Sequence, residues 1–365
     1  MEQKDFYVLL SMVGGLGPRR LEALTGVFGN PENAWHGSEK DLYSVPGMPR
    51  KVIDNLLALR NRVDPGEEIN KLREKGVRVI SLEEPAYPPC LRHIYDPPRV
   101  IYIKGKPEVL HHPMFAVVGA RRASYYGQKV AAKIAGELSL TGLCIVSGMA
   151  RGIDTAAHMG ALKESGNTVA VLGCGVDVVY PRENRKLMAQ IIEKGAVISE
   201  FPPGTSPAAG NFPQRNRVIS GLCRGVLVIE AGDKSGSLIT VDFALEQGRE
   251  VFAVPGQVTN PLNRGAHRLI KQGARLVEEA ADILEELGYS PEQRDSSGNE
   301  GEGNIINLTP QEKKVYNIIS DSPISSELII GKSGMEPSEI LSLLSLMEIR
   351  GLIRQLPGHR YVRSQ

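Results

Sequence analysis

The sequence predicts an α/β protein with a parallel sheet, a helical module before the sheet and a winged-helix module after it. From about residue 113 to residue 273, short β-branched runs alternate with helical segments, as expected of a parallel sheet covered by helices. The first 60 or so residues have a helical pattern interrupted by Gly and Pro turns, and a polar stretch precedes the C-terminal segment. We therefore expect a helix-hairpin-helix, SAM-like domain over 1–65, a Rossmann-like domain over 66–288, a flexible linker over 289–307 and a winged-helix domain over 308–365.

Length and composition indicate a globular protein of more than one domain. The chain has 365 residues, of which 41% are hydrophobic and 23% charged, which are ordinary globular values. Its 43 Lys and Arg residues nearly balance its 42 Asp and Glu residues, and this net charge of +1 by itself argues against a nucleic-acid protein. Net charge averages over patches, however, so a local basic surface remains open.

Cysteine spacing and hydropathy indicate a cytoplasmic protein without a membrane anchor. The four cysteines are far apart and form no CxxC pair, so neither a zinc ribbon nor a thioredoxin-like motif is expected, and a reducing compartment fits. Glu2 and Asp5 stand where a signal peptide would be positive. The uncharged stretch Leu138 to Ala150 is shorter than the roughly 18 apolar residues of a membrane helix.

Two similar turns divide the N-terminal helical segment, one over residues 13–20 and one over residues 45–51. Val-Gly-Gly-Leu-Gly-Pro-Arg-Arg and Val-Pro-Gly-Met-Pro-Arg-Lys each precede an apolar helical stretch. In a helix-hairpin-helix module, such a turn exposes backbone N–H groups that suit a DNA phosphate. Gly closing one helix and Pro opening the next is also typical of an ordinary helix turn. We expect the hairpin fold, and whether it contacts DNA or protein stays open.

Six β-branched runs predict the strands of the central sheet, and most end at Gly or another small residue before a helix. The predicted strands are Phe115–Val118, Cys144–Val146, Thr168–Leu172, Val197–Ser199, Val226–Ile229 and Glu250–Val254. In an open parallel sheet, the loops after the first, second, third and fifth of these strands meet at the carboxyl edge, where ligands bind. A Pro-rich connector over 83–98 lies between two short expected strands, Val77–Ile80 and Val100–Ile103.

The residues after 289 predict a linker followed by three helices and a β-hairpin. Residues 290–307 are polar, acidic and rich in Gly and Ser, so we expect them to be flexible. Thr309-Pro-Gln-Glu then has the pattern of a capped helix start. Helices over 311–319, 325–330 and 337–350, then strands over 352–356 and 360–362, follow the order of a winged helix, a module that binds DNA or protein.

Cofactor and catalytic motifs are incomplete, so we expect no cofactor, no metal and no catalytic residue. The turn Gly119 to Ser124 lacks the second and third glycines of a dinucleotide-binding fingerprint, and Gly331-Lys-Ser lacks the preceding glycine of a phosphate loop. Asp154 and His158 share a helix face, as in an acid–base pair or a metal half-site, but we favour a helix-start Asp beside a satisfied His. Ser147 has no evident base beside it, so it is expected to donate to a ligand phosphate.

Polar residues at the ends of the predicted strands share one chemistry. Arginines, exposed Gly amides and one aromatic ring on a single rim suit single-stranded nucleic acid, because guanidinium groups neutralise phosphates and a base stacked on Phe212 contributes roughly 1–3 kcal/mol. Alternatively, the arginines are ordinary solvated surface residues and Phe212 is part of the core. Four such polar motifs at the same edge of the sheet favour a DNA-binding rim. The expected DNA-binding residues of these motifs are Gly119, Arg121, Arg122, Ser147, Gly148, Arg151, Gly152, Arg182, Asn184, Arg185, Phe212, Pro213, Arg215, Asn216 and Arg217.

In these motifs the chain resembles the DprA/Smf family of DNA-processing proteins. Over about residues 83 to 287, the resemblance is carried by Gly-Ala-Arg (119–121), Ser-Gly-Met-Ala-Arg-Gly-Ile-Asp (147–154), Val-Leu-Gly-Cys-Gly-Val-Asp (171–177), Phe-Pro-Gln-Arg-Asn-Arg-Val-Ile-Ser-Gly (212–221) and Val-Pro-Gly (254–256). It implies an extended Rossmann domain that binds single-stranded DNA without catalysing a reaction. It also implies that the protein loads RecA recombinase onto incoming strands during natural transformation, displaces single-strand-binding protein and forms a homodimer.

The resemblance also assigns roles to single residues. It implies that Arg121 binds a phosphate, that Phe212 with Arg215 and Asn216 forms the base-side pocket, and that Arg182 or Arg185 adds backbone contacts.

Two residues depart from the family pattern. Ala120 stands where many members have Ser, and Ala209 stands where some members have Lys. The positive charge that this Lys gives the DNA-binding site of those members is therefore either supplied by other arginines in this chain or missing.

The main alternative is an enzyme of a related fold that hydrolyses nucleoside monophosphates. Ser-Gly-Ser-Leu-Ile-Thr (235–240) with Glu246 stands where such a site would be, but the paired glycines of those enzymes are absent. We therefore expect Ser235, Gly236 and Ser237 to bind phosphate or only to close the fold, and we expect a protein that is not an enzyme. A third interpretation is a scaffold in which the winged helix recruits partners and the sheet domain dimerises.

Overall fold

The computed structural model describes residues 1–289, 309–319, 324–349, 352–356 and 358–363. Contacts divide the chain into two compact units, Met1–Arg294 and Asp295–Gln365. The first unit holds the N-terminal helices together with the sheet. The expected linker, except for Tyr289, lies outside the described residues, and the expected boundary at residue 65 stays a prediction.

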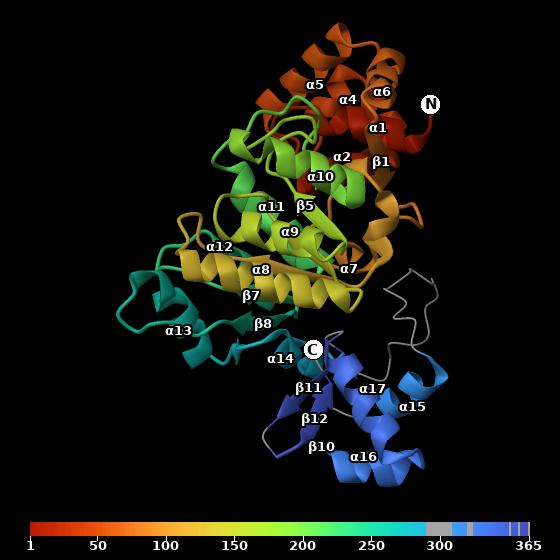
Figure 1. Ribbon diagram of the computed structural model, residues 1–365. Coiled ribbons are helices and arrows are strands. Elements are labelled where there is room, and N and C mark those ends of the chain that lie inside the picture. The colour runs from red at the N-terminus through yellow and green to blue at the C-terminus, as the bar shows by residue number, and fades with distance from the viewer. Residues whose placement is uncertain (290–308, 320–323, 350–351, 357, 364–365) are drawn as a thin grey trace. The chain divides into compact units, whose positions relative to one another are not determined.

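A nine-stranded sheet forms the centre of the first unit (Figure 1), in the order β1-β2-β6-β5-β4-β3-β7-β8-β9. The strands from β3 to β9 are parallel, and β1 and β2 add an antiparallel edge beside β6. Their bounds are Arg78–Ser81 (β1), Val100–Gly105 (β2), Met114–Val118 (β3), Cys144–Ser147 (β4), Thr168–Val171 (β5), Ala196–Ser199 (β6), Gly225–Val228 (β7), Glu250–Ala253 (β8) and Arg275–Leu276 (β9). The six predicted central strands are confirmed, each within one residue at either end.

Helices cover both faces of the sheet because successive strand residues point to opposite sides. Phe115 and Val117 of β3 pack with α8, α9 and α14, whereas Ala116 and Val118 pack with α11, α12 and α13 on the other face. The helices of this unit are Gln3–Ser11 (α1), Pro18–Phe28 (α2), Pro31–His36 (α3), Glu39–Tyr43 (α4), Arg50–Arg62 (α5), Pro65–Glu74 (α6), Pro89–Arg92 (α7), Tyr125–Leu140 (α8), Ile153–Lys163 (α9), Arg185–Lys194 (α10), Asn211–Leu222 (α11), Ser237–Glu246 (α12), Arg264–Lys271 (α13) and Ala280–Glu286 (α14). Short 3₁₀ turns span Pro107–His111, Arg182–Asn184 and Pro261–Asn263. Among the described residues, no helix is long and apolar enough to cross a membrane.

The N-terminal helices form two hairpins, and α1 of the first hairpin packs against β1 and β2 at the antiparallel edge of the sheet (Figure 1). One Gly-rich turn joins α1 to α2 and the other joins α4 to α5. Gly15 (φ +87°) and Gly47 (φ +69°) have left-handed backbone conformations in these turns, which other residues rarely adopt. The first hairpin is held to β2 by a 2.6 Å hydrogen bond between the hydroxyls of Ser11 and Tyr102.

The second unit is a winged helix with its own apolar core. Its elements are Pro310–Ile318 (α15), Ile324–Ser325 (β10), Ser326–Ser333 (α16), Pro337–Ile349 (α17), Ile353–Leu356 (β11) and Arg360–Arg363 (β12). Its sheet has the order β10-β12-β11. Val315, Ile329 and Leu344 lie in the core. The predicted helices and strands are present. The structure also contains the two-residue strand β10, which the sequence pattern did not predict.

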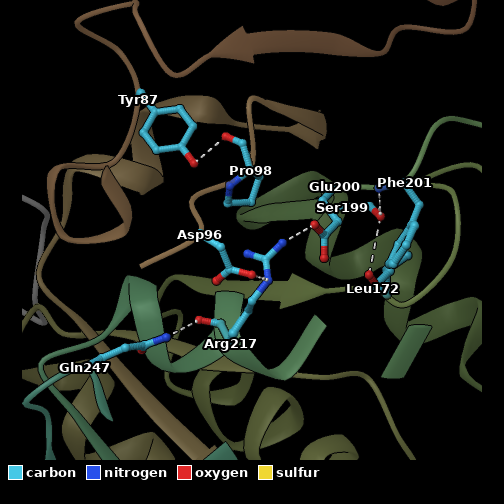
Figure 2. Close-up of polar contacts among 9 residues, drawn as sticks. All are labelled: Tyr87, Asp96, Pro98, Leu172, Ser199, Glu200, Phe201, Arg217 and Gln247. Carbon is cyan, nitrogen blue, oxygen red and sulfur yellow. Dashed lines mark hydrogen bonds and ion pairs between the residues drawn. The ribbon is translucent and has the colours of Figure 1, made fainter. Parts of the chain in front are cut away.

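A buried ion cluster joins the Pro-rich connector to the sheet (Figure 2). The Arg217 side chain on α11 is 3% exposed, contacts the Glu200 carboxylate after β6, and places Nε 3.3 Å from Oδ2 of Asp96 in the connector. The Tyr87 hydroxyl donates to the Pro98 carbonyl at 2.8 Å in the same connector. Burial raises the pKa of Glu200 to about 7, an effect that Arg217 beside it only partly offsets.

This carboxyl predicts a pH dependence of stability. Folding raises the Glu200 pKa from 4.5 to about 7. The contribution of this carboxyl to the free energy of unfolding is therefore fully present below pH 4.5 and is lost as the pH rises through 7. We expect Glu200→Gln to remove this dependence, which amounts to at most roughly 1.4 kcal/mol per pH unit. Denaturant unfolding of both proteins from about pH 4 to pH 8 measures it, and a constant difference between the two would contradict the prediction.

Candidate nucleic-acid interface

A cleft of about 910 Å³ lies at the carboxyl ends of β3 and β7. β3 pairs with β4 on one side and with β7 on the other, so the strand order reverses here and the following loops diverge. Such a switch point is where doubly wound sheets bind ligands. The walls are residues 118–122 after β3, residues 232–236 after β7, and the first turns of α11 and α12. We refer to it as the rim cleft.

The exposed charges that line the rim cleft are positive. Its exposed charged residues are Arg121, Arg122 and Lys234, while the acidic residue that lines it, Asp154, is buried. The N-terminal residues before α11 and α12 are glycines without a side-chain cap, so the positive ends of the two helix dipoles lie in this region. Some of the first-turn N–H groups are already used, since Asn211 donates to the Ala208 carbonyl and Leu238 donates to the Ser235 carbonyl. Lys234 was not among the predicted residues, and it adds positive charge to a cleft in which Ala209 provides none.

Two aromatic rings form a platform beside this charge. The ring centroids of Phe212 and Tyr180 are 5.5 Å apart with planes tilted by 33°, and the Arg121 guanidinium lies 5.0 Å from the Phe212 centroid. The predictions included one aromatic residue, whereas the structure provides two. The available signal for Tyr180 was the Tyr-Pro pair following the glycines after β5, but sequence separation concealed its proximity to Phe212.

The loop after β4 is ordered by a buried arginine. Arg215 on α11 is 4% exposed, and its Nη1 donates to the Gly148 carbonyl at 2.7 Å and also to the Val171 carbonyl. Asp154 accepts hydrogen bonds from the backbone N–H groups of Gly148 (3.1 Å) and Ala150 (3.2 Å). Burial raises the pKa of Asp154, and the nearby Arg215 partly offsets this. The two opposite charges therefore fix the loop from both sides.

Asp154 and His158 have separate partners, but His158 is satisfied at one ring nitrogen only, because its Nε2 has no hydrogen-bond partner among the described residues. His158 Nδ1 lies 2.7 Å from the Thr168 hydroxyl, and burial lowers the pKa of the ring to about 3. Among the described residues, no three His, Cys, Asp or Glu side chains are grouped as metal ligands.

Twelve of the predicted DNA-binding residues line the rim cleft or the small pocket that continues from it beneath Phe212. They are Gly119, Arg121, Arg122, Gly148, Arg151, Phe212, Pro213, Arg215, Asn216, Ser235, Gly236 and Ser237. Arg151 also pairs with Glu183. Arg182 and Arg185 are exposed but line neither cavity, and Gly152 lies where a Cβ would be 2.3 Å from the Ala120 carbonyl oxygen. DNA contact by these residues stays a prediction.

Three of the predicted contacts are corrected by the structure. The Ser147 hydroxyl is buried and donates to the Val117 carbonyl at 2.7 Å, so it is not available to a phosphate. The Asn184 amide donates to the Met149 carbonyl at 3.0 Å and is also buried. Arg217 belongs to the buried ion cluster of Figure 2 and lines neither cavity. The side chains of all three residues form hydrogen bonds or ion pairs with other groups of the protein.

The residues of the hydrolase alternative are not brought together. Ser235 to Ser237 lie at the start of α12, whereas Glu246 is exposed at its last residue. A helix of this length separates its ends by roughly 13 Å. The serine hydroxyls of 235 and 237 lie 2.8 Å apart and face the rim cleft without an adjacent carboxylate from Glu246.

Comparison with known families identifies the chain. The family model for DNA recombination-mediator protein A matches residues 78–288, which contain the sheet and the rim cleft. The chain belongs to the DprA/Smf family. A model for the DprA winged helix domain matches residues 302–359. The predicted family and the predicted α/β fold with a C-terminal winged helix are thus confirmed.

Individual members of the DprA/Smf family agree with this assignment. Protein Smf of Synechocystis is 34% identical over 396 residues, covering 99% of both chains. The X-ray structure of DprA from Streptococcus pneumoniae has 38% identity and a TM-score of 0.68, covering 77% of this chain and 97% of that one. A Helicobacter pylori DprA structure, which concerns a single-stranded DNA binding mode of that protein, has 29% identity and a TM-score of 0.53, covering 57% of this chain and 95% of that one.

The buried arginine predicts a large loss of stability on substitution. Arg215→Met should lower the free energy of unfolding by about 3–5 kcal/mol, because it leaves the Gly148 and Val171 carbonyls without their donor and removes the positive charge that offsets the buried Asp154. The double variant Arg215→Met, Asp154→Asn removes both charges and should recover part of this loss. Urea unfolding of the three proteins is the measurement, and strictly additive losses would show that the two charges are not coupled.

Proposed function

We propose that the rim cleft binds single-stranded DNA and that the protein, as a DprA/Smf recombination mediator, loads RecA onto the bound strand. The observation that carries the proposal is the aromatic platform of Phe212 and Tyr180 beside a cleft whose exposed charges are positive. Stacking platforms in basic grooves are typical of proteins that bind single strands. The DNA binding mode described for the H. pylori relative supports the same ligand class.

Each part of the nucleotide has a matching group in the rim cleft. Arg121 and Arg122 neutralise phosphates, and the N-terminal turn of α12 and the Ser235 and Ser237 hydroxyls donate hydrogen bonds to a further phosphate oxygen. A base stacks on the Phe212 ring. The Arg121 guanidinium also lies over this ring, so it adds a cation beside the stacked base. These contacts need an unpaired base, so a single strand is bound in preference to duplex DNA.

The same groups favour binding without catalysis. The cleft offers cations, N–H groups and rings, whereas Asp154 is tied to backbone amides and Glu246 is distant, so neither of these carboxylates is placed to act as a general base. We therefore assign the protein a carrier role. In this role the protein keeps the strand accessible, displaces single-strand-binding protein and delivers the DNA to RecA. A homodimer would place two rim clefts on one strand and raise its effective affinity.

Arg121→Ala should weaken binding of a fluorescent single-stranded oligonucleotide while the protein stays folded. Loss of one phosphate contact should also reduce the slope of log affinity against log salt by about 0.7. Fluorescence anisotropy over a salt series measures both quantities. Unchanged affinity and slope would remove Arg121 from the site.

A matched control for this substitution is Arg224→Ala. Arg224 is also exposed but precedes β7, at the opposite end of the strand from the rim cleft. Its removal should leave the affinity unchanged. Equal weakening by both substitutions would indicate that general charge, and not the rim cleft, binds the DNA.

Delivery to RecA is tested separately from binding. The full-length protein should accelerate RecA filament formation on single strands already coated with single-strand-binding protein, and Phe212→Ala should reduce this acceleration together with DNA affinity. RecA ATP hydrolysis reports filament formation. Tight DNA binding without any acceleration would contradict the loading role while leaving DNA binding in place.

A further inference from the structure

A second cleft, also of about 910 Å³, lies on the other side of α11 from the rim cleft. It is formed within the first unit by the first hairpin turn (residues 14–20), the connector (96–100) and the loop after β6 (200–205), with Asn211 and Gln214 of α11. We refer to it as the hairpin cleft. None of the predicted DNA-binding residues lines it.

The two clefts are neighbours along one surface. The first two turns of α11 supply Phe212, Pro213 and Asn216 to the rim cleft, and Asn211 and Gln214 to the hairpin cleft. The loop before α11 also lines both, with residues 203–205 on one side and residues 207 and 209 on the other. A flexible strand leaving the rim cleft over the start of α11 therefore enters the hairpin cleft.

The mouth of the hairpin cleft repeats the chemistry of the rim. The Arg19 guanidinium lies 4.7 Å from the ring centroid of Tyr95, compared with 5.0 Å for Arg121 and Phe212. Tyr95 is 84% exposed and stands at the border of the cleft, since it is not itself a lining residue. It immediately precedes Asp96, which lines the cleft. A second Arg–aromatic pair thus stands where a second base would pass.

The first hairpin turn offers groups for a phosphate. Gly17 precedes α2 without a side-chain cap, and Pro18 begins the helix, so the N–H groups of the first turn are not used by a cap. Arg19 and Arg20 of that turn are exposed, and neither has an ion pair with a carboxylate within the described part of the chain.

The floor of the hairpin cleft holds an unused hydrogen-bond acceptor. The Glu200 side chain is 6% exposed, and its Oε1 has no hydrogen-bond partner among the described residues (Figure 2). A buried acceptor without a donor is costly, so this atom points to a ligand that supplies one. Cytosine, adenine and guanine carry exocyclic amino groups, whereas thymine does not.

We propose that the hairpin cleft is a second nucleotide subsite for the same single strand. A phosphate lies at the N-terminus of α2 with Arg19 and Arg20, a base stacks on Tyr95, and a base amino group donates to Glu200. The proposal rests on DNA binding at the rim cleft. It assigns the first helix-hairpin-helix turn to DNA, and it predicts a preference for amino-bearing bases in that position.

Oligonucleotide length separates the two subsites. A short strand of roughly 4–6 nucleotides fills the rim cleft, and a strand of roughly 15–20 nucleotides reaches both. With full-length protein, the double variant Arg19→Ala, Tyr95→Ala should bind the long strand about 5- to 30-fold more weakly and the short strand normally. Arg121→Ala should weaken both. If the Arg19, Tyr95 double variant binds the long strand with unchanged affinity, only the second subsite is overturned. If Arg121→Ala binds both strands with unchanged affinity, the proposed function is overturned.

A matched control exists at the second hairpin. The double variant Arg50→Ala, Tyr43→Ala removes another Arg–Tyr pair, with 5.5 Å between guanidinium and ring centroid, that lines neither cleft. It should bind both strands normally. If it weakens long-strand binding as much as the Arg19, Tyr95 variant does, the effect is not specific to the hairpin cleft and the proposal is overturned.

Base identity tests the Glu200 contact. Long oligo-dC should bind more tightly than long oligo-dT, and Glu200→Met, which has a side chain of similar length without an acceptor oxygen, should reduce that ratio without changing short-strand binding. Thermal unfolding verifies that the variant is folded at the assay temperature, and Glu200→Asp, which keeps the acceptor, should retain part of the preference. An oligo-dC to oligo-dT ratio that is the same for wild type and Glu200→Met would overturn base recognition by Glu200.

Discussion

Arg215 and Asp154 are opposite charges buried together beneath the loop that follows β4, and the geometry of the rim cleft depends on them. The guanidinium spans the carbonyls at the ends of β4 and β5, while the carboxylate holds two backbone N–H groups of the same loop. Because Arg215 is anchored in this way, the first turn of α11 has a fixed position, and with it Phe212. The aromatic platform, the wall between the two clefts and the uncapped start of α11 all follow from that anchor. A buried charge is costly, but here it sets the position of a surface that must be rigid to be useful.

The near-zero net charge is compatible with a basic cleft because many of the acidic groups near it are already engaged. Glu230 accepts the backbone N–H and the hydroxyl of Ser124, Glu183 pairs with Arg151, and Glu200 contacts Arg217. Arg121, Arg122 and Lys234 have no carboxylate partner in the described ranges. The attraction for phosphates is therefore local, and it should extend only about one Debye length, roughly 8–10 Å, at ordinary salt.

Much of the fold could be predicted from the sequence because its determinants are local. Buried parallel strands are short β-branched runs ending in small residues, and each was located within one residue. The site was harder to predict. Arg215 and Arg217 are two positions apart on α11, so their side chains point in different directions, one toward the strand ends and the other toward the connector, and no motif distinguishes a buried arginine from a free one. Tyr180 is 32 residues from Phe212 in sequence, and their contact depends on the complete sheet. The hairpin cleft is formed by segments nearly 200 residues apart, which local patterns cannot bring together.

The antiparallel edge of the sheet has a mechanical consequence. Since β2 is hydrogen-bonded to β6 and α1 is packed on β2, the first hairpin belongs to the same compact unit as the strands beneath the rim cleft. A strand that occupies both clefts therefore has to match the spacing that this unit sets. Adaptation must come from the polymer, which has to bend sharply around the start of α11. Duplex DNA, with a persistence length near 50 nm, resists bending on that scale, so the stiffness of the nucleic acid itself would act as a selection criterion in addition to its charge and its bases.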